Sequence, residues 1–210
     1  MRHGSFGLLV RDLSPKTADK DDRLILTAAH LVTGIADGSA MLSAPPGPEP
    51  GNNGTPCGIV RRRVPLHNLP SIAVDAAVIK PYGGVACSNE AAYGMPNGIR
   101  DLFVLEPHQK SELMSVRKHG AASHETTGSL LPCSTSDLKL RDADIRYTAG
   151  WDVYGTDGKR FAERGDSGSI VVDENKAVVG MLVAVDEGDG RAFFHGIKQI
   201  FAALNIALYD

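Results

Sequence analysis

Two short motifs, far apart in the chain, constrain its fold more than any other feature of the sequence. Ser167 lies within the tetrapeptide Gly-Asp-Ser-Gly at residues 165–168, and His30 ends the tetrapeptide Thr-Ala-Ala-His at residues 27–30. A serine hydroxyl is a poor nucleophile at neutral pH unless an imidazole at hydrogen-bonding distance accepts its proton. If the two motifs act together, the fold must bring distant parts of the chain into contact.

Asp75 is the candidate for a third member of this group. The imidazole needs a buried carboxylate that fixes its tautomer and stabilises its charged form, and Asp75 lies in an apolar segment. The order along the chain is then His30, Asp75, Ser167. It differs from the Ser, acid, His order of α/β-hydrolases and from the Asp, His, Ser order of subtilisin-like enzymes. Ser169 also occupies the last glycine position of the Gly-x-Ser-x-Gly motif that an α/β-hydrolase requires.

On these residues the chain resembles the chymotrypsin/trypsin-type serine proteases, in particular the bacterial members that lack disulfides and propeptides. The resemblance covers nearly the whole chain, from about Phe6 to about Leu208. It implies an all-β fold of two six-stranded antiparallel β-barrels with a C-terminal α-helix. The N-terminal barrel is expected at about residues 5–85 and the C-terminal barrel at about residues 95–195.

The resemblance also implies the role of each residue. Ser167 attacks a peptide carbonyl, His30 accepts its proton and later protonates the leaving amine, and Asp75 orients His30. The backbone N–H groups of Gly165 and Ser167 form the oxyanion hole, and a glycine at 165 suits a turn that bends sharply. The expected substrate is a protein or peptide, and neither a cofactor nor a metal is expected.

The specificity pocket is less well defined by the sequence. In the family its floor lies six residues before the nucleophile, which maps onto Phe161, so the carboxylate of a trypsin-like pocket is absent and the pocket is expected to be apolar or filled. The wall maps onto Val183, Ala184 and Val185. His195 resembles pocket histidines that bind Glu or Gln side chains in some relatives, and a buried structural histidine is the alternative. An acidic loop follows the wall and either restores a negative pocket or is simply solvated; its members are Asp186, Glu187 and Asp189.

Length and charge agree with a single domain that binds neither nucleic acid nor membranes. All-β folds of 210 residues form one unit routinely. A formal net charge of −3 gives no reason to expect nucleic acid or an anionic membrane surface as a partner. No apolar run approaches the roughly 18 residues of a membrane span.

The cysteines point to a reducing compartment. Cys57, Cys87 and Cys133 are odd in number and widely spaced, so a disulfide framework is not expected. Secreted relatives usually carry a cysteine directly after the catalytic histidine, where this chain has Leu31. No apolar stretch at the N-terminus is long enough for a signal peptide. A cytoplasmic location is expected, or a secreted one if a leader has been removed.

Hydrophobic periodicity predicts short strands followed by one helix. Apolar residues recur every three or four positions over residues 197–208, which predicts an amphipathic C-terminal helix. Five prolines and three glycines over residues 44–56 predict a loop, and residues 81–100 are expected to connect the barrels. Strands are expected at residues 8–10, 23–27, 59–64, 72–79, 113–120, 127–131, 144–147, 169–173, 177–185 and 192–195.

Asp166 leaves the control of activity open. In relatives made as zymogens this aspartate pairs with a new N-terminal amine, liberated before an Ile-Val-Gly-Gly-like sequence, and no such sequence occurs here. Either Asp166 has a partner within the chain, or an activating protein partner or ligand completes the site. The rival hypothesis from another class is a catalytically silent or conditional peptide-binding or regulatory module on the same fold.

Overall fold

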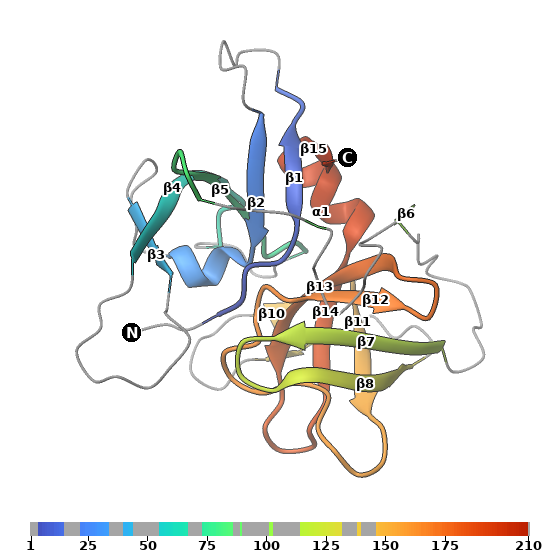
Figure 1. Cartoon of the computed structure of the whole chain (residues 1–210). Helices are drawn as coiled ribbons and strands as arrows, with labels where there is room; N and C mark the ends of the chain where they lie inside the picture. Colours follow the sequence, from blue (N-terminus) through green and yellow to red (C-terminus); the bar gives the residue numbers. More distant parts are fainter. Residues whose placement is uncertain are drawn as a thin grey trace.

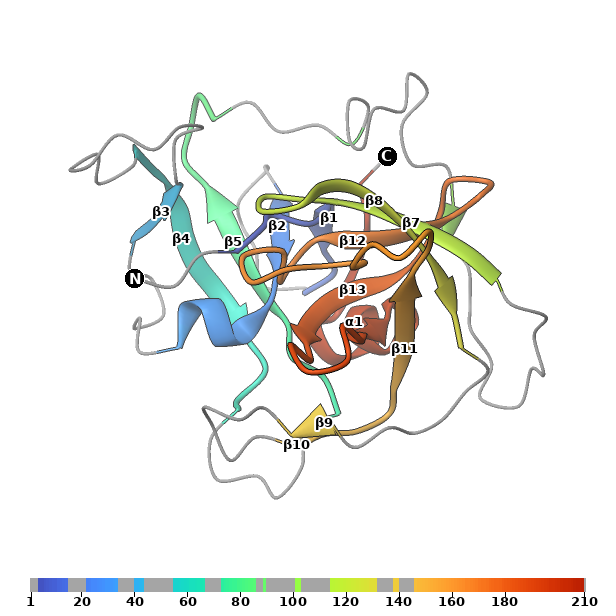
Figure 2. The same ribbon diagram turned by 90° about the horizontal axis from the view of Figure 1, so that it is seen from below.

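In the part of the chain that the structure describes, two large β-sheets lie side by side and an α-helix packs beside them (Figure 1 and Figure 2). The computed structural model describes residues 4–14, 22–33, 40–43, 55–66, 73–85, 89, 101–102, 114–131, 138–139 and 146–209. Most of the connection expected at residues 81–100 lies outside these ranges, as do Cys87 and Cys133. Within them, no helix is long and apolar enough to span a membrane.

The first sheet has six antiparallel strands in the order β15-β1-β2-β5-β4-β3. The central strand β2 is apolar on both faces: Leu24 and Leu26 point into the main core, whereas Ile25 packs on the opposite side. The strands are β1 (Leu9–Asp12), β2 (Arg23–Thr27), β3 (Ala40–Ser43), β4 (Thr55–Arg63), β5 (Ala77–Pro81) and β15 (Ile206–Leu208).

Several predicted boundaries in this sheet are wrong. The strand expected over residues 72–79 begins only at Ala77, so Asp75 lies in the segment that enters β5. The loop expected over residues 44–56 ends too late, because Thr55 and Pro56 already belong to β4. Pro56 lies opposite Leu42, next to a register shift, and such an irregularity tolerates a proline that cannot donate to the ladder.

The second sheet closes on itself. Its order is β12-β7-β8-β11-β14-β13, and an additional pairing of β12 with β13 completes a six-stranded antiparallel barrel. A short strand, β6 (Asp101–Leu102), pairs with β13 in parallel. Strands β9 (Leu138–Lys139) and β10 (Arg146–Tyr147) pair with each other as a separate ribbon. The barrel strands are β7 (Met114–Gly120), β8 (His124–Leu130), β11 (Gly150–Gly155), β12 (Ile170–Asp173), β13 (Ala177–Val185) and β14 (Ala192–Gly196).

The C-terminal helix is shorter than predicted. Helix α1 (Ile197–Leu204) ends because Asn205 takes a left-handed conformation with φ of 49°. The chain then returns as β15, in which Leu208 pairs with Val10 of β1. The helix predicted to reach residue 208 is therefore wrong at its end, and the last strand of the chain belongs to the first sheet.

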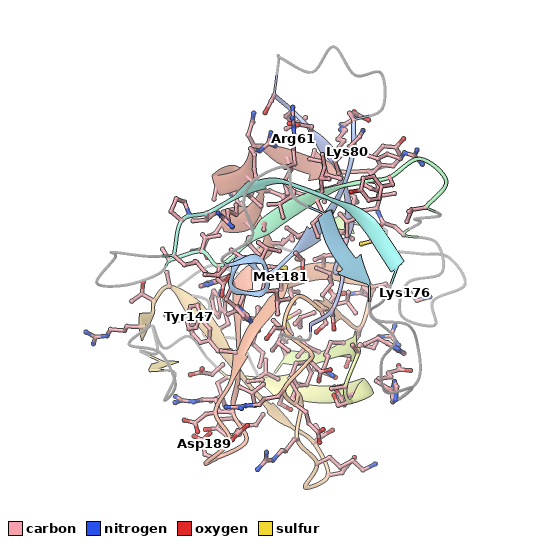
Figure 3. All side chains as sticks on the ribbon, turned by 90° about the vertical axis from the view of Figure 1, so that its left-hand side faces the viewer. Arg61, Lys80, Tyr147, Lys176, Met181 and Asp189 are labelled. Carbon is pink, nitrogen blue, oxygen red and sulfur yellow. The ribbon has the colours of Figure 1, made fainter. Side chains whose placement is uncertain are left out.

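The main hydrophobic core spans both sheets. Leu26 and Val78 of the first sheet belong to the same buried cluster as Met181 and Phe193 of the second. Met181 lies near the middle of the molecule, between Lys80 of the first sheet and the far end of the second (Figure 3). The expectation of an all-β protein with two β-barrel-like halves and a C-terminal helix is confirmed, and the boundary between the halves is where the candidate residues meet.

Candidate active site

The structure brings His30 and Asp75 together. His30 lies in the 3₁₀ turn η1 (Ala29–Val32) directly after β2, and Asp75 lies just before β5. Since β2 and β5 are paired neighbours, the two residues meet at the same end of the sheet. His30 Nδ1 lies 2.7 Å from Asp75 Oδ2, and the His30 backbone N–H donates to Oδ1 at 3.0 Å. Asp75 is fully buried, whereas 21% of the His30 side chain is exposed.

Tyr147 is a third donor to this carboxylate, and the sequence did not reveal it. Its hydroxyl donates to Asp75 Oδ2 at 2.6 Å from the short strand β10, and the side chain is fully buried. Burial by itself raises the pKa of Asp75, but the hydrogen bonds from His30 and Tyr147 and the charge of His30 outweigh it and lower the pKa below its usual value. The carboxylate therefore stays ionised although it is fully buried.

Ser167 lies on a tight turn between β11 and β12 and is partly exposed. The turn closes through the Asp166 N–H, which donates to Glu163 O at 3.1 Å, and through the Ser169 N–H, which donates to Asp166 O at 2.9 Å. The Ser167 hydroxyl donates to the Val183 carbonyl oxygen at 3.2 Å. The turn packs against the end of β2, because a Cβ added at Gly168 would lie 2.8 Å from Thr27 Oγ1.

Two backbone donors in this turn have no acceptor in the described part of the chain. The N–H groups of Gly165 and Ser167 make no hydrogen bond there, although the Asp166 N–H between them does. Gly165 adopts φ of 106°, a conformation that favours glycine. Unpartnered amides on either side of one residue, next to a serine hydroxyl, suit the binding of a developing oxyanion.

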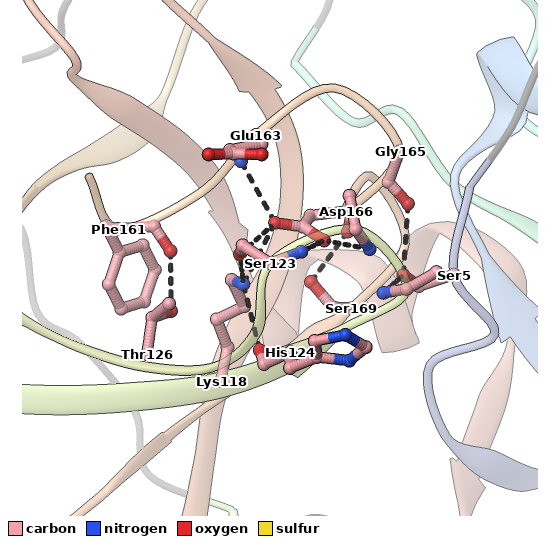
Figure 4. A network of polar contacts seen from close by, with 12 residues as sticks. Ser5, Lys118, Ser123, His124, Thr126, Phe161, Glu163, Gly165, Asp166 and Ser169 are labelled. Atoms are coloured by element: carbon pink, nitrogen blue, oxygen red, sulfur yellow. Dashed lines mark hydrogen bonds and ion pairs between the residues drawn. The ribbon is translucent and has the colours of Figure 1, made fainter. Parts of the chain in front are cut away.

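Asp166 has its partner within the chain. Lys118 Nζ on β7 lies 2.9 Å from Asp166 Oδ2, and neither side chain is exposed. The β7–β8 turn adds the N–H groups of Ala122 and Ser123, which donate to Oδ1 at 2.8 and 3.1 Å (Figure 4). The Ser123 hydroxyl donates to Oδ2 at 2.6 Å and also contacts Lys118 Nζ. We call Lys118 together with the turn residues 121–124 the Asp166 cradle.

Opposing effects set the charge of this pair. Burial raises the pKa of Asp166, but hydrogen bonds from Ser123, Glu163 N–H and Lys118 outweigh it, and the pKa falls below its usual value. Burial also lowers the pKa of Lys118, and the attraction of Asp166 only partly offsets this. Of the two alternatives for Asp166, the structure thus shows the internal partner.

The residues expected to line the pocket are mostly closed to solvent. Phe161 is fully buried in the core of the second sheet, and Val183 and Ala184 are almost as buried, whereas Val185 is partly exposed. His195 is fully buried against the rings of Tyr147 and Phe193. Neither nitrogen of its ring has a hydrogen-bond partner among the described residues. Burial lowers the pKa of His195 to about 4, against the opposing effect of Asp75.

The acidic loop after β13 is largely neutralised by arginines. The Arg191 guanidinium lies 3.8 Å from Asp186 and 3.7 Å from Asp189. Arg164 Nε lies 2.7 Å from Glu187 Oε1. Asp189 lies at the end of the molecule away from the first sheet (Figure 3). These carboxylates are paired at the surface and do not converge on Phe161.

Leu31, directly after His30, packs against the start of the described chain. A Cβ added at Gly4 would lie 2.1 Å from Leu31 Cδ1, so the leucine side chain fills the space above Gly4. Of the three cysteines, Cys57 is described, and it is buried.

Comparison with solved structures places this architecture among known folds. No protein-family model matches the sequence, and no curated protein matches it. Nocardiopsis protease superposes with a TM-score of 0.64 at 15% identity, over 99% of this chain and 93% of that chain. Cellulomonas bogoriensis chymotrypsin gives 0.62 at 15% identity, over 99% and 91%. A glutamic acid specific serine protease, described as using a histidine triad in substrate binding, gives 0.62 at 15% identity, over 98% and 92%. The chain therefore has the double-barrel fold of the bacterial chymotrypsin-like serine proteases.

Proposed function

We propose that this protein is a serine endopeptidase that hydrolyses peptide bonds through His30, Asp75 and Ser167. The single observation that carries the proposal is the convergence of the His30–Asp75 pair and the Ser167 turn at one end of β2. The fold of the structural neighbours also supports a protease. The two unpartnered amides of the turn suit an oxyanion hole, which such a reaction requires.

The proposed reaction follows from the hydrogen bonds of His30 and Ser167. Asp75 accepts a hydrogen bond from Nδ1–H of His30 and so favours the tautomer with the proton on Nδ1. In that tautomer Nε2 can accept a proton. The Ser167 hydroxyl leaves the Val183 carbonyl, transfers its proton to Nε2, and Oγ forms a bond to the substrate carbonyl carbon. The carbonyl π electrons move to oxygen, which the N–H groups of Gly165 and Ser167 stabilise.

Collapse of this tetrahedral intermediate breaks the C–N bond. The amine leaves with the proton from His30, and an acyl group remains on Ser167. Water then attacks the acyl-enzyme, with His30 again accepting a proton, and the second product leaves as a carboxylic acid. Asp75 remains ionised throughout and stabilises the imidazolium.

The proposal includes competence without an activating cleavage. Asp166 orients the turn of Ser167 in this structure through Lys118 and the β7–β8 turn, so no new N-terminal amine is needed. For specificity we propose an apolar or filled pocket, since Phe161 is buried and the acidic loop is paired with arginines. Cleavage mainly after Lys or Arg in a peptide library would contradict this pocket.

One observation favours a second function, a peptide-binding or regulatory module that does not turn over. The Ser167 hydroxyl donates to Val183 O, an acceptor outside the proposed triad. Such a module would bind peptides between the two sheets without forming an acyl-enzyme.

Covalent labelling with a fluorophosphonate probe separates the two functions. We expect the isolated wild-type protein to gain the mass of one phosphonyl group, and Ser167→Ala to gain none. Ser129→Ala serves as the matched control, because this partly buried serine on β8 lies outside the site. A wild-type protein that stays unlabelled at high probe concentration would overturn the endopeptidase proposal and support the binding module.

A further inference from the structure

A short segment at the start of the described chain lies across the turn that carries Ser167. We call residues 4–7 the strap. They run from Gly4 beside Leu31 to Gly7, whose N–H donates to Leu26 O at 2.8 Å. Ser5 is the buried residue of the strap, with 7% of its surface exposed, and in Figure 4 it lies directly beside Gly165.

Ser5 holds two carbonyl groups of the turn. Its backbone N–H donates to Ser167 O at 2.7 Å. Its hydroxyl donates to Gly165 O at 3.3 Å and accepts a hydrogen bond from the Ala121 N–H at 2.9 Å. Because the Ala121 N–H occupies a lone pair of Oγ, the hydroxyl proton is directed toward Gly165.

These carbonyls matter because each peptide unit is planar. Fixing Gly165 O fixes the plane of the 165–166 peptide, and fixing Ser167 O fixes the plane of the 167–168 peptide. The Ser167 N–H lies in the unit between them, whose carbonyl is held by the Ser169 N–H and hydroxyl at 2.9 and 2.6 Å. Ser5 therefore restrains the chain on both sides of a proposed oxyanion-hole donor.

The strap is also tied to the strand that leads to His30. Thr27 Oγ1 donates to Ser5 O at 2.9 Å, and Thr27 ends β2 just before the His30 turn. One residue thus bridges the segment of the proposed base and the turn of the proposed nucleophile. A third contact, through Ala121, joins it to the Asp166 cradle.

The strap and the turn pack so closely that neither Gly7 nor Gly168 has room for a side chain. Gly168 adopts φ of 93°, and a Cβ there would lie 2.2 Å from Ser5 O. A Cβ at Gly7 would lie 2.6 Å from Gly168 O. Glycines at both places let the two backbones approach closely.

We propose that Ser5 is a positioning residue of the oxyanion hole, which sets the orientation of the Ser167 amide relative to His30. This inference rests on the proposed endopeptidase function. Its hydroxyl touches neither substrate nor the reacting atoms, so Ser5 acts through the turn that it holds.

The test compares Ser5→Ala with Ser14→Ala, a control serine whose hydroxyl accepts a hydrogen bond from Arg62 at 2.9 Å, away from the site. The rate of fluorophosphonate labelling and the kcat and KM for an unfolded protein substrate are measured for each. Losing one oxyanion-hole donor outright costs about 100- to 1,000-fold in kcat, and loosening a donor's support costs less. We expect Ser5→Ala to lower kcat and the labelling rate about 10-fold with KM unchanged, and Ser14→Ala to match the wild type.

Amide hydrogen exchange gives a readout that does not depend on activity. In Ser5→Ala we expect the Ala121 and Asp166 amides to exchange about 10-fold faster, because one loses its acceptor and the other its anchored peptide, while the β13 amides keep their protection. Unchanged exchange at both amides, or labelling and kcat equal to the wild type, would overturn the role of Ser5. A wild-type protein that does not label would overturn the endopeptidase proposal, and the exchange result would still decide whether Ser5 holds the turn.

Discussion

At the scale of single residues, the proposed catalysis depends on how Asp75 keeps its charge. A carboxylate with no exposed surface pays a large desolvation penalty unless donors surround it. His30 supplies two of these donors and Tyr147 the third, which together keep the pKa of Asp75 below its usual value. Tyr147 comes from the second half of the chain, so the charge of Asp75 depends on contact between the two halves.

Replacing Tyr147 with phenylalanine tests this dependence. The ring remains and only the donor is lost, so we expect the pKa of Asp75 to rise and kcat to fall about 10-fold. A hydrogen bond to a charged group contributes about 1.5–3 kcal/mol, and we expect a similar loss in the free energy of unfolding. Tyr154→Phe is the control, because that hydroxyl bonds Asp189 at the surface. Equal kcat in the two variants would contradict a role for Tyr147.

His195 predicts a particular loss of stability in acid. Its pKa in the folded protein is about 4, below the ordinary value of 6.5, so the unfolded chain binds the proton first as the pH falls. Stability should therefore start to decline below pH 6.5 and stop declining on this account below about pH 4. At about 1.4 kcal/mol for each tenfold change in proton affinity, the loss is on the order of 3 kcal/mol. Urea unfolding of the wild type and His195→Phe across this range measures it, and equal pH dependence in both would refute it.

At the scale of elements, strand β7 and the β7–β8 turn hold Asp166, the role that the proposed function gives them in place of an activating cleavage. Five donors converge on the Asp166 carboxylate, and four of them come from Lys118, Ala122 and Ser123. The same turn donates to Ser5, so it supports the Ser167 turn at two points.

Lys118→Met should therefore damage both stability and activity. Removing one partner of a buried ion pair costs about 3–5 kcal/mol, because the other charge stays buried. Arg117→Met is the matched control on the same strand, since its contact with Glu125 is a half-exposed pair at 3.8 Å worth at most about 1 kcal/mol. Thermal unfolding and labelling of Ser167 measure the two effects. Equal losses of stability in the two variants would show that the buried Lys118–Asp166 pair does not stabilise the fold more than a surface pair does.

Sequence patterns could predict elements whose signals are local. The strands Arg23–Thr27 and Ala177–Val185 match their predictions residue for residue, since each is an apolar run that ends at polar or turn-forming residues. The end of α1 could not be predicted in this way. The apolar spacing continues to Leu208, and only pairing with β1 turns the last residues into a strand.

The site shows the same division. His30, Asp75 and Ser167 lie in recognisable motifs, and the structure brings the segments of all three to one end of β2. The partners of Lys118 and Tyr147 could not be predicted, because they are residues far away in the sequence. A lysine among strand residues and a tyrosine in a two-residue strand give no signal of burial in the sequence.

At the scale of the whole molecule, the last strand fastens the two halves to each other. Helix α1 packs on β13 and β14 of the second sheet, and β15 then joins the first sheet beside β1. The Arg62 guanidinium reinforces this return by donating to Leu204 O at 2.9 Å while pairing with Asp12. These contacts join the first sheet to the helix that packs on the second sheet.

We expect the two halves to unfold together. Ile206 is buried in the core that both sheets share, so Ile206→Ala should cost about 2–5 kcal/mol within a single cooperative transition. Lys198→Ala on the exposed side of α1 should change the free energy of unfolding by less than about 0.5 kcal/mol. Two separate transitions in calorimetry, with only one shifted by Ile206→Ala, would show that the halves are independent.

The most direct measurement for the central claim is the cleavage of an unfolded protein by the isolated chain. Purified wild type and Ser167→Ala are incubated with a denatured substrate, and new peptide termini are quantified by mass spectrometry. We predict cleavage by the wild type and a loss of at least about 1,000-fold in Ser167→Ala, since the nucleophile is removed. Cleavage at equal rates by both proteins, or by neither, would contradict the account.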